Sequence, residues 1–222
     1  MNSIKIGLMV PANNTTMEGE ILKWLPAGST CRTLKIPRAP GLLTKQTVSA
    51  YKAAALDLAR QFSQDNLDLV VYGCTSAGLI SGPIGDAELA AQLAATTGKP
   101  VVTTASAMVR ALEESGAKQV AIVTPYLDQV NEQLTVFLAA SDIGVKRLSS
   151  FKAANVEELG RITADQVAQR ARETMGPDCD AMFIACTQLP THAILDGLRG
   201  ELGRPVWSSI QASAWMTEKE MG

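Results

Sequence analysis

Two of the four cysteines occupy matching positions in the sequence, each directly after a short apolar segment. Cys74 follows residues 69–73, and Cys186 follows residues 182–185. A thiol at the end of a buried strand, where the next helix begins, lies near backbone N–H groups whose dipoles lower its pKa. Two such thiols on opposite sides of a substrate can add to a double bond or carry protons. Their paired placement therefore favours a catalytic role over that of small buried hydrophobes.

Hydrogen-bond donors stand next to both cysteines and after two other apolar segments that end in proline. These candidate substrate-binding residues are Asn14, Thr75, Ser76, Tyr126 and Thr187. Hydroxyl groups and free backbone N–H groups at such loops suit a carboxylate and the enediolate-like charge that develops on it. The same side chains also suit helix caps, and a helix N-terminus is itself a site for anions. We therefore predict a small carboxylate as the substrate.

The rest of the sequence gives no sign of a metal or an organic cofactor. His192 is the only histidine, no Cys-x-x-Cys pair occurs, and Cys31 and Cys179 are interpreted as core residues. Zinc sites normally draw on several cysteines and histidines at short spacings. The glycines fit neither nucleotide-binding fingerprint. We therefore expect no metal, no cofactor and reduced thiols.

Composition and charge argue against several kinds of partner. The chain is 46% apolar with a formal net charge of -2, and no cluster of lysine or arginine stands out. A nucleic acid partner is therefore not expected. No apolar run approaches the roughly 20 residues that cross a bilayer, and the N-terminus offers no signal peptide. We expect no membrane association and a cytoplasmic location.

Short apolar segments alternate with helical stretches along the whole chain, which is the pattern of βαβ units and parallel sheets. The expected strands are 4–10, 68–73, 100–103, 119–124, 145–148, 181–185 and 205–207. The expected helices are 16–25, 48–64, 86–97, 105–115, 129–140, 163–175, 195–202 and 212–220.

The order of these segments repeats, which indicates an internal duplication. Residues 69–75 resemble 182–187, and residues 98–104 resemble 203–209. We predict an α/β fold with two pseudo-symmetric, doubly wound, flavodoxin-like lobes. The lobes are 1–104, onto which a terminal helix in 208–222 packs back, and 105–207. Because ligands bind at the carboxyl ends of parallel strands, the active site is expected in the cleft between the lobes.

Four segments of the sequence resemble the aspartate/glutamate racemase superfamily, in the branch of maleate cis-trans isomerases and arylmalonate decarboxylases. The resemblance covers nearly the whole chain and is carried by residues 10–18, 73–76, 124–132 and 185–190. The first of these is similar to the isomerase signature Asn-Thr-Thr-Met-Glu after a strand and proline. The segment 124–132 is closer to its decarboxylase counterpart.

The resemblance implies roles for individual residues. Asn14 and Asn155 match the carboxylate-binding asparagines of the isomerases, although Asn155 read alone is a helix N-cap. Tyr126 matches the binding tyrosine of both groups, and Cys186 the second catalytic cysteine. Cys74 matches the first, where decarboxylases typically carry glycine. The implied activity is conversion of maleate to fumarate through a covalent Cys74 adduct, in a homodimer and without a cofactor.

Three other functions use the same features. A racemase or epimerase would pass a proton between the two cysteines. A decarboxylase of disubstituted malonates would need a bulky apolar subsite, for which Leu42, Leu43 and Ile80 are candidates. A carboxylate-binding protein without turnover would leave the paired thiols without a purpose. The connection 38–47 is either a lid over the site or a plain loop.

Overall fold

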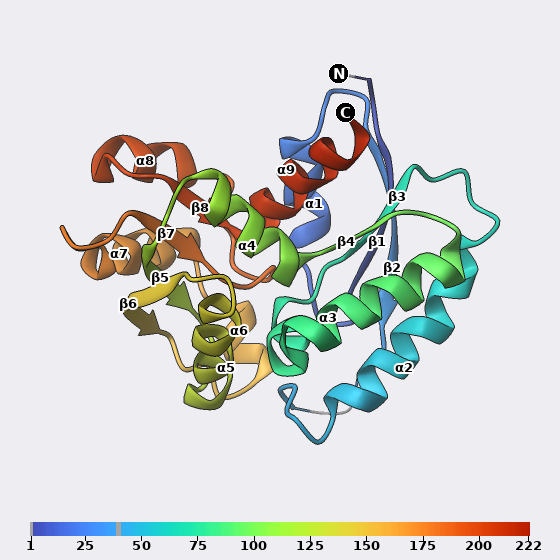
Figure 1. The fold of residues 1–222 in the computed structure, drawn as a ribbon, viewed down its shortest axis with the longest axis horizontal. Coiled ribbons are helices and arrows are strands. Elements are labelled where there is room, and N and C mark those ends of the chain that lie inside the picture. Colours follow the sequence, from blue (N-terminus) through green and yellow to red (C-terminus); the bar gives the residue numbers. More distant parts are fainter. Residues whose placement is uncertain (1, 39–40) are drawn as a thin grey trace.

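Within residues 2–38 and 41–222, which the computed structural model describes, the chain forms two parallel sheets of four strands each (Figure 1). The strand orders are β2-β1-β3-β4 and β6-β5-β7-β8. The strands are β1 (Lys5–Pro11), β2 (Thr30–Ile36), β3 (Leu69–Tyr72), β4 (Val101–Thr103), β5 (Gln119–Thr124), β6 (Gly144–Ser150), β7 (Ala181–Ile184) and β8 (Val206–Ser208). The two orders are equivalent, so the predicted fold class, with two doubly wound lobes, is confirmed.

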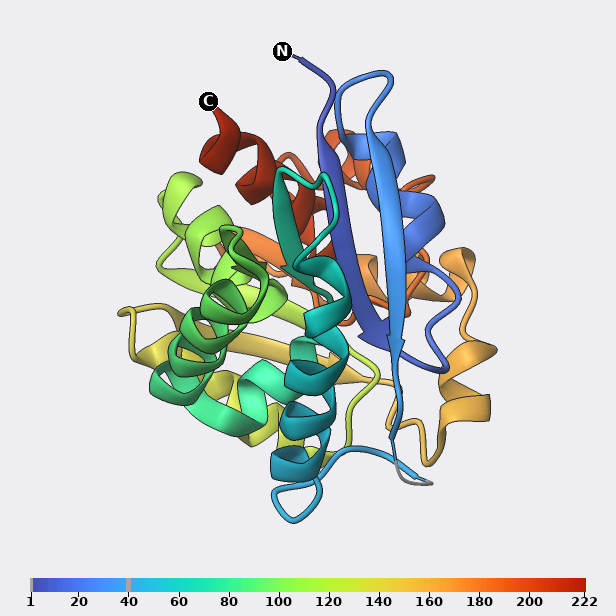
Figure 2. The ribbon, with the colours of Figure 1, turned by 90° about the vertical axis from the view of Figure 1, so that its right-hand side faces the viewer.

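Helices cover both faces of each sheet (Figures 1 and 2). They are α1 (Met17–Trp24), α2 (Val48–Ala59), a 3-10 turn (Arg60–Phe62), α3 (Thr75–Thr97), α4 (Thr104–Glu114), α5 (Asp128–Ala139), α6 (Val156–Gly160), α7 (Ala164–Thr174), α8 (Leu195–Leu202) and α9 (Ser209–Met221). In β1, Ile6 and Leu8 pack in the core cluster that contains α1, whereas Met9 packs in the cluster that contains α2. An unbroken apolar strand follows from this two-sided burial.

Two elements differ from those expected. Strand β2 was missed because it is an edge strand that pairs with β1 alone, and its residues are mostly polar and partly exposed. Helix α3 begins at Thr75 and not at residue 86, because a kink joins two helices. The kink lies at Gly82, whose φ of 72° suits glycine, and is followed by Pro83.

Helix α9 connects the two sheets. It packs against α1 and α4 and contacts both β4 and β8. The predicted boundary at residue 104 falls at the start of α4, after the last strand of the first sheet. One apolar core cluster continues from the first sheet into the second. The division into lobes 1–104 and 105–207 therefore stays a prediction.

None of the helices in the described part of the chain is long and apolar enough to cross a membrane.

Candidate active site

A pocket lies at the carboxyl ends of β1, β3, β5 and β7, the two central strands of each sheet. It is lined by residues that follow these strands, and it brings together the predicted site residues Asn14, Cys74, Thr75, Ser76, Tyr126, Cys186 and Thr187. Parallel strands end at one edge of their sheet, so the duplication places the two cysteine loops around a single cavity.

Cys74 is the N-cap residue of α3, and only 3% of its surface is exposed to solvent. Burial raises the pKa of its thiol, and smaller opposing effects come from Ala77, Tyr51, Ser76 and Arg38. Its Sγ lies 3.7 Å from Ser76 Oγ. The expectation of a lowered thiol pKa is therefore wrong for this pocket, because loss of hydration outweighs the dipoles at the helix N-terminus.

Cys186 has a φ of 127°, which non-glycine residues rarely adopt. The Gln188 backbone N–H donates a hydrogen bond to its Sγ at 3.5 Å. Burial, with a smaller contribution from negative charge on Cys74, nevertheless raises the pKa of the Cys186 thiol to about 11. Ionisation of Cys74 therefore makes Cys186 harder to ionise, so the two thiols do not readily lose their protons together.

The raised thiol pKa values predict slow alkylation at neutral pH. Because only the thiolate reacts, labelling of Cys186 by iodoacetamide should rise with pH up to about 11. Labelling of Cys74 should also continue to rise above pH 9.0, the ordinary thiol pKa. Mass spectrometry of the two peptides measures both rates, with a cysteine in a short unstructured peptide as the control. A plateau for either cysteine below about pH 8 would contradict the burial argument.

Asn14 and Thr187 connect the two halves of the pocket. Asn14 Nδ2 donates to Thr187 Oγ1 at 3.0 Å, and the Thr187 hydroxyl donates to the Gly73 carbonyl at 3.0 Å. Asn14 Oδ1 accepts the backbone N–H groups of Thr16 and Met17 at the start of α1. Both side chains are almost fully buried, so these bonds fix the spacing of the β1, β3 and β7 loops.

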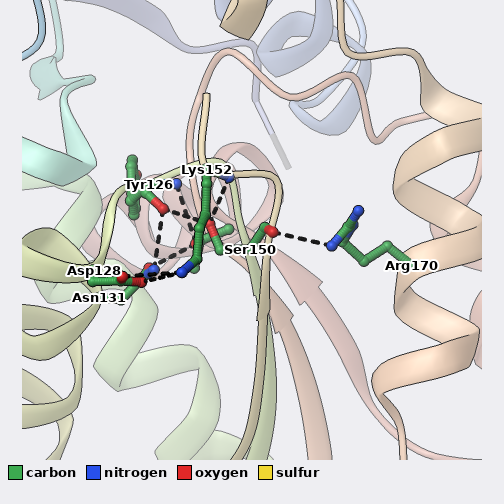
Figure 3. Close-up of polar contacts among 7 residues, drawn as sticks. Tyr126, Asp128, Asn131, Ser150, Lys152 and Arg170 are labelled. Atoms are coloured by element: carbon green, nitrogen blue, oxygen red, sulfur yellow. Dashed lines mark hydrogen bonds and ion pairs between the residues drawn. The ribbon is translucent and has the colours of Figure 1, made fainter. Parts of the chain in front are cut away.

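The backbone of Tyr126 is held by the end of β6 and by α5 (Figure 3). Its carbonyl accepts hydrogen bonds from Asn131 Nδ2 at 3.1 Å and from the Ser150 hydroxyl. Arg170 in turn donates to the Ser150 carbonyl at 3.0 Å. The ring of Tyr126 is therefore anchored at its base, as a substrate-binding side chain requires.

The hydroxyl of Tyr126 is buried and has no hydrogen-bond partner in the described part of the chain. Burial raises the pKa of this hydroxyl well above its ordinary value, and charge on Cys186 or Cys74 raises it further. The phenol therefore stays protonated and can donate to a group bound between the two sulfurs. A buried donor of this kind binds strongly to an anion, because it has no water to lose.

Asn155 is not among the residues that line the pocket, and its expected role in substrate binding stays a prediction. It is exposed at the N-cap of α6, where its side-chain oxygen accepts the backbone N–H groups of Glu157 and Glu158. The capping geometry thus occupies its acceptor. Ala153 and Leu159 line the pocket from this segment instead.

Two residues that line the pocket, Arg38 and Gln188, were not among the predicted site residues. Arg38 follows β2, the strand that was not predicted, and its Nη1 donates to Asn13 Oδ1 at 3.3 Å. Among the lining residues that the structure describes, it is the only lysine or arginine, and none is acidic. Gln188 exchanges hydrogen bonds of 3.0 Å with Thr15 across the lobes. Because Arg38 is present and no acidic side chain is among the described lining residues, the pocket carries positive charge, which suits an anion.

One wall of the pocket is apolar. It consists of Leu42, Leu43, Leu127, Val130 and Leu159. Of the three residues proposed for an apolar subsite, Ile80 is not among those that line it. Pro40, in the connection 38–47, lies outside the described residues, and the expectation of a lid there stays a prediction.

No group of three histidine, cysteine or carboxylate side chains that could hold a metal occurs in residues 2–38 and 41–222.

Known proteins resemble this chain along most of its length. The family model described as arylmalonate decarboxylase matches residues 6–222. A maleate isomerase of Geobacillus stearothermophilus is 26% identical, covering 98% of this chain and 91% of that protein. An arylmalonate decarboxylase of Bordetella bronchiseptica is 30% identical, covering 79% of this chain and 74% of that protein.

A solved structure shows the same fold. It is a Nocardia farcinica maleate cis-trans isomerase, in a cysteine-to-serine mutant with a covalently bound succinylcysteine intermediate. It aligns with a TM-score of 0.90 and 24% identity, covering 99% of this chain and 93% of that one.

Proposed function

The chain belongs to the arylmalonate decarboxylase family, and we propose that within this family it is an isomerase that converts maleate to fumarate through a covalent adduct on Cys74. The observation that carries the proposal is the pair of buried thiols, Cys74 and Cys186, that line one pocket. A single proton-donating thiol would serve decarboxylation. A second thiol supplies a nucleophile that adds to an alkene and also departs readily.

Substrate binding is proposed to rest on donors from both halves of the chain. The free backbone N–H groups of Thr75 and Ser76 at the N-terminus of α3 bind one carboxylate. The Tyr126 hydroxyl, Asn14 and Thr187 lie on the other sides of the cavity. Arg38 supplies the positive charge that a dianion needs. Together they hold the alkene carbons between the two sulfurs.

The proposed reaction uses Cys74 as the nucleophile and Cys186 as the proton donor. The Cys74 thiolate forms a sulfur–carbon bond, and the π electron pair moves toward the neighbouring carboxylate. The Cys186 thiol gives its proton to the adjacent carbon, so a succinyl adduct with two carboxylates forms and Cys186 becomes a thiolate. The carbon–carbon bond is now single and rotates. The Cys186 thiolate then removes a proton, and Cys74 leaves as thiolate to give fumarate.

The direct test is to incubate the purified protein with maleate, without any added cofactor, and to follow the olefinic protons by NMR. We expect the maleate signal to decrease as the fumarate signal grows. Protein inactivated by iodoacetamide provides the control. If folded protein with both thiols free formed no fumarate from maleate, the proposed isomerase activity would be refuted.

The apolar wall keeps decarboxylation of an arylmalonate as a second candidate function. Leu42, Leu43 and Leu127 offer a surface that maleate does not need and that an aryl or alkyl group would fill. Release of carbon dioxide from phenylmalonate measures this activity. A higher kcat/KM for phenylmalonate than for maleate would reverse the order of the two candidates.

Arg38 provides a test of the proposed binding mode. Arg38→Met keeps much of the side-chain length but removes the charge, so we expect KM for maleate to rise about tenfold or more. Arg38→Lys should recover part of this loss, because it restores the charge without the planar guanidinium. Steady-state kinetics at low and high salt measures the effect.

Lys45→Met is the matched control for Arg38. Lys45 is exposed in the same connection and does not line the pocket. Lys45→Met changes the net charge of the protein by the same amount as Arg38→Met. Because Lys45 lies outside the pocket, KM for maleate should stay near that of the unmodified protein. If Lys45→Met and Arg38→Met raised KM equally, maleate binding would depend only on the overall electrostatic field of the protein.

We further propose a homodimer in the cytoplasm. The homodimer rests on the family resemblance, and light scattering measures it. The cytoplasmic location is supported by the four free cysteines, because reducing compartments keep such thiols unpaired.

A further inference from the structure

Ser209 connects the two cysteine loops from behind the pocket. It is the first residue of α9 and is completely buried. Its Oγ accepts a hydrogen bond from the Cys186 backbone N–H at 3.0 Å and another from Thr75 Oγ1 at 3.1 Å. One hydroxyl therefore contacts the loop of the second cysteine and the residue that follows the first. Ser209 itself does not line the pocket.

The bond to Cys186 acts on a strained peptide. A φ of 127° at a non-glycine residue is a strained backbone conformation and persists only where surrounding contacts hold it. The Ser209 oxygen receives the N–H of that same residue. The conformation also brings Cys186 Sγ within 3.5 Å of the Gln188 N–H. Loss of the Ser209 oxygen would therefore let the peptide relax and turn the sulfur away from its donor.

We propose that Ser209 is a positioning residue, whose hydroxyl fixes the Cys186 thiol and the Thr75 loop at the relative placement that the reaction needs. Its expected effect on turnover rests on the proposed function. Its effect on the geometry of Cys186 does not, because the two hydrogen bonds are present without substrate. A misplacement of about 1 Å at a proton donor can lower a rate about 100-fold.

The duplication supplies a matched position without this role. Thr104 is the first residue of α4 and follows β4, as Ser209 is the first residue of α9 and follows β8. The preceding residues, Thr103 and Ser208, cap their helices in the same way. Thr104 is equally buried, but its hydroxyl has no hydrogen-bond partner in the described part of the chain. Only one of the two equivalent hydroxyls therefore contacts a cysteine loop.

The experiment compares Ser209→Ala, Ser209→Thr and Thr104→Val. We expect Ser209→Ala to lower kcat for maleate about 10- to 100-fold, with KM within about threefold. At a fixed pH, its Cys186 should react with iodoacetamide about tenfold more slowly, whereas Cys74 should be unchanged. Ser209→Thr restores the hydroxyl and should recover most of both properties, since threonine occupies the equivalent position 104. Thr104→Val should leave both unchanged.

Three results would overturn the proposal: no change in kcat and labelling for Ser209→Ala, equal slowing of both cysteines, or an equal loss in Thr104→Val. Should Ser209→Ala fail to fold, hydrogen exchange of the Cys186 amide in the unmodified protein decides instead. Protection supports the bond to Ser209, and rapid exchange refutes it. Because labelling and exchange need no maleate, an inactive but folded protein would refute the isomerase proposal without deciding the role of Ser209.

Discussion

Replacing Cys74 with alanine is expected to lower the rate of maleate isomerisation by about 10⁴-fold or more, which corresponds to about 5.5 kcal/mol. The pocket contains one other sulfur, that of Cys186, which lies on the loop after β7. Its proposed role is to donate a proton to carbon, so it does not replace the missing nucleophile. Without addition of sulfur, the carbon–carbon double bond keeps its order and does not rotate. NMR of maleate and fumarate at high enzyme concentration measures the residual rate.

Cys179→Ala is the matched control for this change. Cys179 is also buried, but it lies before β7 and does not line the pocket. Its replacement removes the same atoms and should leave the rate within about twofold. If Cys74→Ala retained a substantial fraction of the activity while Cys179→Ala behaved normally, the covalent route would be excluded. Binding and proton transfer by the remaining residues would then have to account for the isomerisation.

The central strands were predictable because burial on both faces gives an unbroken apolar run in the sequence. Strand β3, with Leu69 to Tyr72, is of this kind. Strand β2 has no such run, because one of its edges and much of its surface face water. Its residues, such as Thr30 and Lys35, therefore show no pattern that distinguishes the strand from a loop. Missing β2 also hid Arg38, which enters the pocket only because this strand runs parallel to β1.

The cysteine loops were predictable from the duplication, whereas their energetics were not. Local sequence shows that Cys74 ends a buried strand, where free backbone N–H groups favour the thiolate. The opposing effect is burial of Cys74 by segments distant in the chain, and no local pattern records it. Asn155 illustrates the converse case. Its local interpretation as a helix cap describes what the structure shows, while the role implied by resemblance stays a prediction.

Replacing Cys186 with serine is expected to trap the reaction after sulfur has added. Serine has nearly the same size but is a far weaker acid than a thiol, so the carbon next to the adduct takes its proton slowly from water, and the hydroxyl does not remove that proton again. Turnover should therefore fall about 10²- to 10³-fold, and an adduct should accumulate on Cys74. Intact-protein mass spectrometry should show an increase equal to one molecule of maleic acid, and peptide mapping should assign it to Cys74.

The double variant Cys74→Ala, Cys186→Ser separates this trap from nonspecific modification by the alkene. It retains Cys31 and Cys179, so any mass increase that survives in it arises outside the pocket. Loss of the adduct in the double variant, with accumulation in Cys186→Ser alone, would assign the adduct to Cys74 and place its formation before the removal of the proton from carbon. Full activity of Cys186→Ser without an adduct would instead mean that the enediolate collapses without protonation at carbon. Cys186 would then act through its hydrogen bonds and not through its proton, and its raised pKa would have no part in the rate.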